Sequence, residues 1–455
     1  MPQIITIDTP TLGDRSYLVH DGQAGLVIDP QRDIDRVLAL ARGHGVTIAA
    51  VFETHIHNDY VTGGYALAQA TGADYHTNIA DQIAFERVGV DDGDVVAVGA
   101  HLRVRVLSTP GHTHTHLAYA VEEDGRPVAV FTGGSLLDGS VGRPDLLGPQ
   151  HTRALARAQY ASAHRLAREL PDHIALYPTH GFGSFCSSAP GETSGPTLGA
   201  QRLANPVLTL GEQAFVDDLL AGLDAWPAYY AHMAPANVAG PAAPDLSPVR
   251  RANAAELRER IAAGQWVVDL RGRVAFAAGH LSGTLNFGLD GGFATHLGWL
   301  LPRGAELALL GESPEQVAEA QRELVRIGID RPAASATGSP AHWSGDQPLA
   351  TIARATFADL AQVRHHRDVT VLDVRRDREW GAGHLSGALH VPLHQLPTRI
   401  GEVPAGDVWV HCAGGYRASI GASLLKAAGR RVVAVDDGFE HVHPADLQPR
   451  TREAV

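Results

Sequence analysis

Residues 408–429 read VWVHCAGGYRASIGASLLKAAG, and this stretch decides the fold of the C-terminal part of the chain. Its apolar start predicts a strand and its alanine- and leucine-rich end predicts a helix, which places Cys412 on the short loop between them. Gly414 and Gly415 let successive backbone amides turn toward the sulfur. Together with the helix dipole and Arg417, these amides favour an anion there. We therefore predict Cys412 and Arg417 as catalytic residues and the two glycines as substrate contacts.

The surroundings of this loop occur twice in the chain. WVVDLRGRVAFAAGHLSGTLNF starts at Trp266, and TVLDVRRDREWGAGHLSGALHV starts at Thr370. A match this long at one fixed offset indicates two copies of a domain of about a hundred residues. We place the middle copy at 248–345 and the C-terminal copy at 351–455.

The C-terminal copy resembles the rhodanese family through the DVR motif at Asp373, the GHLSGALHVPL segment and the loop 412–417. This resemblance implies that Cys412 accepts a sulfane sulfur and passes it to a thiol, to sulfite or to cyanide. Two alternatives remain open. One is a cysteine phosphatase, whose loop is usually one residue longer, and the other is a buried structural cysteine.

The middle copy contains no cysteine. After its expected strand at 306–310 the sequence reads GESPEQ, where the reactive loop should follow. We therefore expect the same α/β scaffold without the activity, acting as a spacer, a docking domain or a guide for substrate.

The N-terminal part, residues 1–235, alternates short β-rich runs with helical stretches. We expect strands at 25–29, 49–55, 103–108, 128–132 and 174–179, and helices at 33–44, 63–71 and 153–170. Two proline- and alanine-rich stretches, at 225–248 and 331–348, are typical of linkers.

Histidines gather where these strands should end. His55 and His57 form an H-x-H, His112 lies in STPGH, and His180 lies in YPTHG. Three convergent imidazoles suit Zn or Fe(II) with one open position, and we predict His55, His57 and His112 as the ligands. His180 is a fourth candidate that would contact the substrate. The alternative is a set of histidine-rich surface loops that bind no metal.

The motifs THIHND, TPGH and YPTHG, in this order, resemble the metallo-β-lactamase superfamily. The resemblance implies an αββα sandwich. Tyr60 stands where the last His of the family's HxHxDH is expected, and Gly134 stands where the Asp of TGD is expected. Both differences fall mainly on a second metal position, so a dinuclear hydrolase is not expected.

Within this superfamily the N-terminal part is most similar to persulfide dioxygenases fused to rhodanese domains. The similarity lies in GRPD at 142–145, in YPTHG and in the Asn-Pro pair at 205–206. It implies one Fe(II), bound through His55 and His112, with Gly134 at the position of the carboxylate ligand. His57 or Asp138 would have to complete such a site.

Two further residues are candidate substrate contacts. Arg143 would bind an anionic thiol persulfide, with a salt bridge as the alternative. Cys186, six residues after His180, would hold or relay sulfur, with a small apolar filler as the alternative.

Composition limits the partners. The chain has 455 residues and a formal net charge of -13, so neither nucleic acid nor a membrane surface is an expected partner. The N-terminus lacks the pattern of a secretory signal, and no run of 18 or more apolar residues occurs. Two cysteines in so long a chain favour reactive thiols in the cytoplasm over a disulfide.

Three functions fit these features. The first is a persulfide dioxygenase coupled to sulfur transfer through Cys412, with a low-molecular-weight thiol persulfide and sulfite or thiosulfate as partners. The second is a mononuclear zinc thioester hydrolase with a sulfurtransferase, and the third is a sulfur carrier without metal. The assembly is left open, and a homodimer is compatible with three linked domains.

Overall fold

The computed structural model describes residues 2–181, 183–188 and 195–448. The chain divides into two compact units, Met1–Asp245 with Val325–Gly328, and Leu246–Leu324 with Ile329–Val455. No helix in the described part of the chain is both long and apolar enough to span a membrane.

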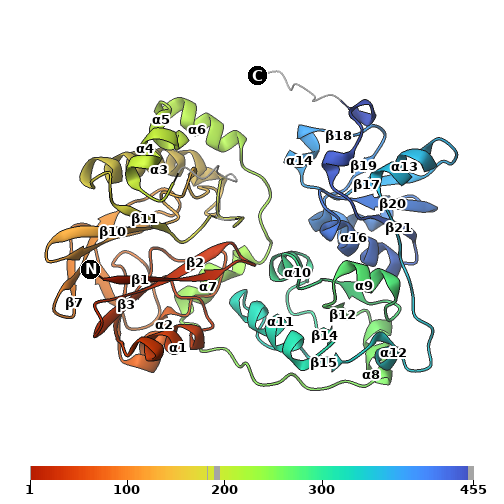
Figure 1. The fold of residues 1–455 in the computed structure, drawn as a ribbon, viewed down its shortest axis with the longest axis horizontal. Coiled ribbons are helices and arrows are strands. Elements are labelled where there is room, and N and C mark those ends of the chain that lie inside the picture. Colours follow the sequence, from red (N-terminus) through yellow and green to blue (C-terminus); the bar gives the residue numbers. More distant parts are fainter. Residues whose placement is uncertain (1, 182, 189–194, 449–455) are drawn as a thin grey trace. The chain divides into compact units, whose positions relative to one another are not determined.

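The N-terminal unit contains two sheets (Figure 1). The first has the strand order β1-β2-β3-β4-β5-β6, and the second has the order β11-β10-β9-β8-β7. The first sheet consists of β1 (Gln3–Thr9), β2 (Asp14–His20), β3 (Ala24–Ile28), β4 (Thr47–Phe52), β5 (Asp74–Asn78) and β6 (Val88–Val90). The second consists of β7 (Val95–Val98), β8 (Leu102–Ser108), β9 (Leu117–Glu123), β10 (Arg126–Gly133) and β11 (Ala175–Pro178).

The two sheets pack face to face, and helices cover the outer face of each (Figure 1). Successive side chains of β2 point to opposite faces of the first sheet and are apolar on both. Tyr17 and Val19 belong to the core between the sheets, whereas Leu18 packs with residues of the helices on the other face. The helices are α1 (Asp35–His44), α2 (Gly64–Thr71), α3 (Pro149–Glu169), α4 (Leu198–Ala204), α5 (Pro206–Thr209), α6 (Glu212–Ala221) and α7 (Tyr230–Ala239). The predicted αββα sandwich is confirmed.

Both stretches predicted as linkers contain secondary structure. The first is a linker only in part, since the boundary between the two units at Asp245 lies inside it, whereas the second lies within a folded copy. The first contains α7, in which Met233 and Asn237 are buried despite the internal Pro235. The second contains β15 (Ala334–Thr337) and α12 (Pro340–Ser344), and Trp343 of α12 is almost completely buried. Burial of a few large side chains outweighs the local preference of prolines and alanines for irregular structure.

In the second unit the middle copy forms a parallel sheet of order β13-β12-β14-β15. Its strands besides β15 are β12 (Trp266–Asp269), β13 (Leu285–Asn286) and β14 (Leu307–Gly311). Its helices besides α12 are α8 (Ala254–Ala262), α9 (Arg273–Ala278), α10 (Phe293–Leu300) and α11 (Pro314–Arg326).

The C-terminal copy has a parallel sheet of order β16-β21-β20-β17-β19. The strands are β16 (Ala353–Ala355), β17 (Thr370–Asp373), β19 (Leu389–His390), β20 (Asp407–His411) and β21 (Arg431–Val435), and β18 (His384–Leu385) pairs with β22 (Leu447–Gln448). The helices are α13 (Phe357–Arg364), α14 (Asp377–Ala382), α15 (Leu396–Arg399) and α16 (Tyr416–Ala427), with single 3-10 turns at η1 (Leu393–Gln395), η2 (Ile400–Glu402), η3 (Phe439–His441) and η4 (Pro444–Asp446). Residues 449–455 of the predicted domain lie outside the described residues.

The repeated motif makes the same contacts in both copies. Arg271 donates to Asp269 at 2.6 Å and to the Gly279 carbonyl at 2.9 Å. Arg375 donates to Asp373 at 2.7 Å and to a glycine carbonyl at 2.8 Å. A buried carboxylate at the end of a strand thus holds the arginine that closes the following turn, which explains the repetition of this motif.

Candidate functional site

Buried histidines lie close together in the N-terminal unit, on loops that follow β4, β8 and β11. His55, His112 and His180 each offer a ring nitrogen, and these nitrogens lie within 4.8 Å of one another. The Nε2 atoms of His55 and His180 are 3.3 Å apart. The three rings come from loops that are far apart in the sequence, and all are 0–1% exposed.

His112 is oriented toward this group. Its Nδ1–H donates to the Arg143 carbonyl at 2.8 Å, and its Nε2 is buried with no hydrogen-bond partner among the described residues. Burial lowers the pKa of His112 to about 3, and burial also lowers the pKa of His55 well below its usual range. Both rings are therefore neutral, as metal ligation requires.

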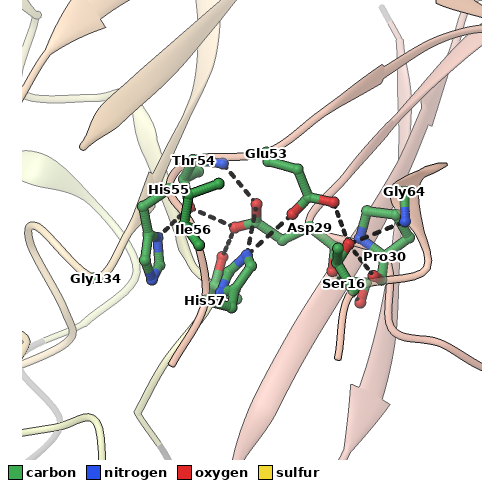
Figure 2. Close-up of polar contacts among 12 residues, drawn as sticks. Ser16, Asp29, Pro30, Glu53, Thr54, His55, Ile56, His57, Gly64 and Gly134 are labelled. Carbon is green, nitrogen blue, oxygen red and sulfur yellow. Dashed lines mark hydrogen bonds and ion pairs between the residues drawn. The ribbon is translucent and has the colours of Figure 1, made fainter. Parts of the chain in front are cut away.

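His57 joins a second group, with Asp59 and His180. Figure 2 shows that its ring faces Asp29 and Glu53, and its Nε2 lies 3.2 Å and 3.1 Å from their carboxylates. These carboxylates raise the pKa of His57 well above its usual range although burial opposes this, while burial raises the pKa of Glu53 to about 7. Nδ1 of His57 has no hydrogen-bond partner within the described residues, so this nitrogen could bind a metal once the ring loses a proton.

Two buried carboxylates lie on the other side of His180. Its Nδ1 is 3.0 Å from Asp14 and 3.2 Å from Asp59. Burial raises the pKa of Asp14 to about 7; the pKa of Asp59 is lowered by His180 although burial opposes this. His180 itself has a pKa raised to about 9 by these carboxylates, against the effect of burial.

The donor set fits one divalent transition metal. Imidazole nitrogens converge on one point, and Asp14 Oδ2 and Asp59 Oδ1 are buried without hydrogen-bond partners in the described part of the chain. Unsatisfied buried acceptors of this kind are what a bound cation satisfies. The structure brings His180 beside the predicted ligands His55 and His112, and it also groups His57 with Asp59 and His180. Because the pKa of His180 is raised, this ring would have to lose a proton to bind a metal.

The structure explains why residue 134 is a glycine. A Cβ atom placed there would lie 2.7 Å from Cγ of His112 and 2.9 Å from its Nε2. The imidazole of His112 fills the space in which a side chain would begin, so no carboxylate can be accommodated without moving His112. Asp138 does not replace it, since it accepts hydrogen bonds from the Gly195 amide and from Gln201 instead.

The contacts of Arg143 and Cys186 favour the structural alternatives. Arg143 is 4% exposed and donates to Asp145 at 2.7 Å through both Nε and Nη2. Cys186 is fully buried, and burial raises the pKa of its thiol well above the usual range. A buried neutral thiol is a poor nucleophile. Substrate binding by either residue stays a prediction.

The sequence analysis missed the buried carboxylates Asp14, Asp29 and Glu53 of this site, and also His116 and Asn237. His116 accepts a hydrogen bond from the Gly134 amide at 3.0 Å and lies beside His55, with ring centroids 4.9 Å apart. Asn237 of α7 donates to the carbonyls of His57 and Tyr60, both at 2.9 Å, and fixes the H-x-H loop. The GHTHTH run signals His116, whereas no local pattern signals Asn237.

The second candidate site is the loop between β20 and α16. Cys412 is 2% exposed, and the amide of Gly415 lies 3.1 Å from its sulfur. Gly415 has φ = 89°, a left-handed conformation that brings its N–H onto the sulfur. A side chain at Gly414 would meet only open space.

Arg417 is paired. Its Nη1 and Nη2 donate to the two carboxylate oxygens of Glu379, each at 2.6 Å. This contact lowers the pKa of Glu379 to about 2 although burial opposes the charged form. Arg417 therefore anchors the start of α16 to α14 and shares its charge with a carboxylate.

Comparison with known proteins agrees with this geometry. Residues 12–180 match the metallo-beta-lactamase superfamily, and residues 356–444 match the rhodanese-like domain. A hydroxyacylglutathione hydrolase from Maricaulis maris is 31% identical over 236 residues, which cover 46% of this chain and 88% of that protein. The chain belongs to the metallo-beta-lactamase superfamily.

Other matches are partial. A hydroxyacylglutathione hydrolase from Polaromonas sp. is 36% identical over 172 residues, 37% of this chain, and the match spans 62% of that relative's length. A crystal structure of a metallo-beta-lactamase from Staphylococcus aureus has a TM-score of 0.66 and 28% identity, and the match covers 74% of this chain and 99% of that one. The chain thus combines a metallo-beta-lactamase fold with a C-terminal rhodanese-like domain; for the middle copy that relationship stays a prediction.

Proposed function

We propose that this protein oxidises a low-molecular-weight thiol persulfide in its N-terminal unit and transfers sulfane sulfur through Cys412. The observation that carries the proposal is a buried metal-ligand set, His55, His112 and His180, in which Gly134 excludes the family's usual carboxylate. This set supports one metal ion better than two. It occurs in the same chain as a cysteine loop suited to a sulfur anion.

A single Fe(II) would be held by His55, His112 and His180, and it would supply a site at which a thiolate-like sulfur and O2 react. The chain's own residues prepare that site. Burial of the rings excludes bulk water, and Asp14 and Asp59 hold the proton on Nδ1 of His180 so that its Nε2 faces the other rings. In the overall reaction persulfide, O2 and water give thiol, sulfite and two protons.

Sulfur transfer is assigned to Cys412. Its thiolate attacks the outer sulfur of a second persulfide, the S–S bond of the donor breaks, and the donor thiolate leaves with the electron pair. Sulfite then attacks the outer sulfur on Cys412, which yields thiosulfate and regenerates the Cys412 thiolate. The Gly415 amide stabilises the anionic sulfur in both states.

The test is oxygen uptake on addition of glutathione persulfide to protein loaded anaerobically with Fe(II). We expect uptake with one sulfite per O2 in a Cys412→Ser variant, and thiosulfate in place of part of that sulfite in the wild type. Loss of oxygen uptake in His180→Ala, with the fold intact by circular dichroism, would support its place in the site. Absence of uptake by fully loaded wild-type protein would refute the oxidation.

A second function is favoured by curated relatives such as the hydroxyacylglutathione hydrolases from Polaromonas sp. and Maricaulis maris. With Zn in the same three-histidine site, the N-terminal unit would hydrolyse a glutathione thioester. Thioester turnover under anaerobic conditions, without oxygen uptake on persulfide, would select this function. If metal-free and metal-loaded protein transfer sulfur equally, and neither oxidises persulfide nor hydrolyses thioester, the protein would act as a sulfur carrier without metal.

A further inference from the structure

The middle copy packs directly on the helix that follows Cys412. Tyr416 donates to the Gly288 carbonyl at 2.8 Å, and Ser419 donates to the side chain of Asn286 at 2.7 Å. The backbone amide of Asn286 in turn donates to Ser423 at 3.1 Å. These partners in the middle copy lie just after its GHLSG turn, so the repeated motif of one copy is seated on α16 of the other.

Close packing at the start of α16 makes this contact specific. A Cβ atom placed at Gly291 would lie 2.6 Å from Cζ of Tyr416, so the middle copy touches this ring with bare backbone. His296 of α10 meets the same ring, with centroids 5.6 Å apart, and burial lowers the pKa of His296 to about 4. His296 is partly buried, and its neutral ring is compatible with a contact between the two copies that excludes part of the solvent.

One cation of the middle copy reaches the cysteine loop. Arg273, the first residue of α9, donates through Nε to Asp436 at 2.6 Å. Asp436 follows β21 and also accepts from Nε of Arg354 at 2.9 Å. A Cβ atom placed at Gly415 would lie 3.0 Å from Nε of Arg273 and 3.2 Å from Cγ of Asp436. Arg273 and Asp436 therefore press against the residue whose amide faces the Cys412 sulfur.

The electrostatics agree with this placement. The pKa of Arg273 is raised chiefly by its hydrogen bond with Asp436, and the Asp290 and Cys412 anions add to the effect. Without Arg273, the carboxylate of Asp436 would remain against Gly415 with only Arg354, whose side chain is 38% exposed, to balance it. A less balanced negative charge beside the loop would disfavour a second anion on sulfur.

We propose that the middle copy, which has no nucleophile of its own, supplies Arg273 as a positioning residue for the Cys412 sulfur site. Arg273 holds Asp436 in place behind Gly415, keeps the Gly415 amide directed at the sulfur, and adds a positive charge within range of the persulfide. The middle copy is then one wall of a composite sulfur site rather than a spacer. This inference rests on the proposed sulfur transfer through Cys412.

The test compares Arg273→Ala and Arg273→Lys with Val274→Ala in the full-length chain. Val274 neighbours Arg273 on α9 and is 51% exposed, so it controls for a change on the same helix. The first readout is the rate of alkylation of Cys412 by iodoacetamide against pH, followed by mass spectrometry of its peptide. The second is kcat and KM for transfer of sulfur from glutathione persulfide to sulfite, measured as the thiosulfate formed.

We expect Arg273→Ala to move the midpoint of the alkylation curve upward by about one pH unit and to lower kcat/KM by about tenfold. Arg273→Lys should recover most of the midpoint shift, since it keeps the charge, and only part of kcat, since it loses the planar geometry at Asp436. Val274→Ala should match the wild type in both readouts. Thermal melting of each variant serves as the control that it is folded.

The outcomes separate the two claims. A wild-type alkylation curve in Arg273→Ala, with wild-type transfer, would overturn the role of Arg273. Wild-type protein that never gains sulfur on Cys412 would overturn the proposed transfer, and the alkylation curve would still decide whether Arg273 acts on the loop. Equal losses in Arg273→Ala and Arg273→Lys with no midpoint shift would mean a merely structural contact and would also overturn the proposal.

Discussion

The substitution Gly134→Ala tests whether His112 occupies the space of the missing carboxylate. The added methyl carbon would sit 2.7 Å from Cγ of His112, far inside van der Waals contact, and the ring must move. Overpacking of a buried site costs about 1–3 kcal/mol, and losing the 2.8 Å hydrogen bond from His112 to the Arg143 carbonyl costs about 1 kcal/mol more. We expect a total of about 2–4 kcal/mol, or a Tm lower by roughly 5–15 °C for a unit of this size.

The assay is calorimetry of metal-free protein, followed by metal analysis after loading with Fe(II) or Zn. Displacement of His112 should also lower the bound metal well below one ion per chain. Gly43→Ala is the matched control, because Gly43 lies in α1 with no atom near its missing side chain, and alanine there should raise stability slightly. Gly134→Ala protein that melts with the wild type and binds a full metal ion would refute the reasoning.

Three further predictions concern other contacts. Asn237→Ala should destabilise the N-terminal unit by about 2–4 kcal/mol in urea titration, because it leaves the carbonyls of His57 and Tyr60 unpaired, and a loss under about 0.5 kcal/mol would contradict this. The pair of Glu379 with Arg417 should contribute on the order of 3 kcal/mol to stability, fully present above the unfolded pKa of Glu379 near 4.5 and lost as the pH falls toward 2. The free energies of unfolding of the wild type and of Glu379→Gln should therefore converge at low pH. A difference that stays constant with pH would contradict the pairing. Removal of metal with a chelator should lower the Tm of the N-terminal unit by several degrees in calorimetry and leave the Tm of the second unit unchanged. Re-addition of Fe(II) or Zn should restore the Tm of the N-terminal unit. An unaltered thermogram would argue against a metal site.

The strands and helices that were expected in the N-terminal unit are all present because their apolar runs are unambiguous, whereas β1, β2, β5, β6, β7, β9 and α4 to α7 were not predicted. The strand expected at 25–29 is β3 at Ala24–Ile28, and the helix expected at 153–170 is α3 at Pro149–Glu169. The helices α7 and α12 and the strand β15, inside the two stretches predicted as linkers, were missed for one reason. Composition reflects the local preference of prolines and alanines for irregular structure. The burial of side chains such as Met233 and Trp343 against the rest of the fold outweighs that preference.

The candidate site was partly predictable because its histidines follow strand ends. Spacing along the chain indicates which side chains emerge near one edge, but not which ring nitrogen faces the centre. The carboxylates of Asp29 and Glu53 decide that for His57, and Asp14 and Asp59 help decide it for His180. Asn237 could not have been found at all, since it binds a loop 180 residues away.

The pairing of arginines near Cys412 also bears on the choice between sulfur and phosphate chemistry. A cysteine phosphatase must neutralise a dianion, which calls for an arginine whose two donors are free to bind oxygens. In this loop both terminal nitrogens of Arg417 are held by Glu379, and Arg273 is held by Asp436. A phosphate would have to displace a carboxylate that lies 2.6 Å from its arginine, whereas a persulfide carries one diffuse negative charge that the Gly415 amide can meet directly. The pairing of Arg417 with Glu379 therefore argues against phosphate chemistry at Cys412, independently of loop length, and leads us to expect a singly charged persulfide rather than thiosulfate as the sulfur donor.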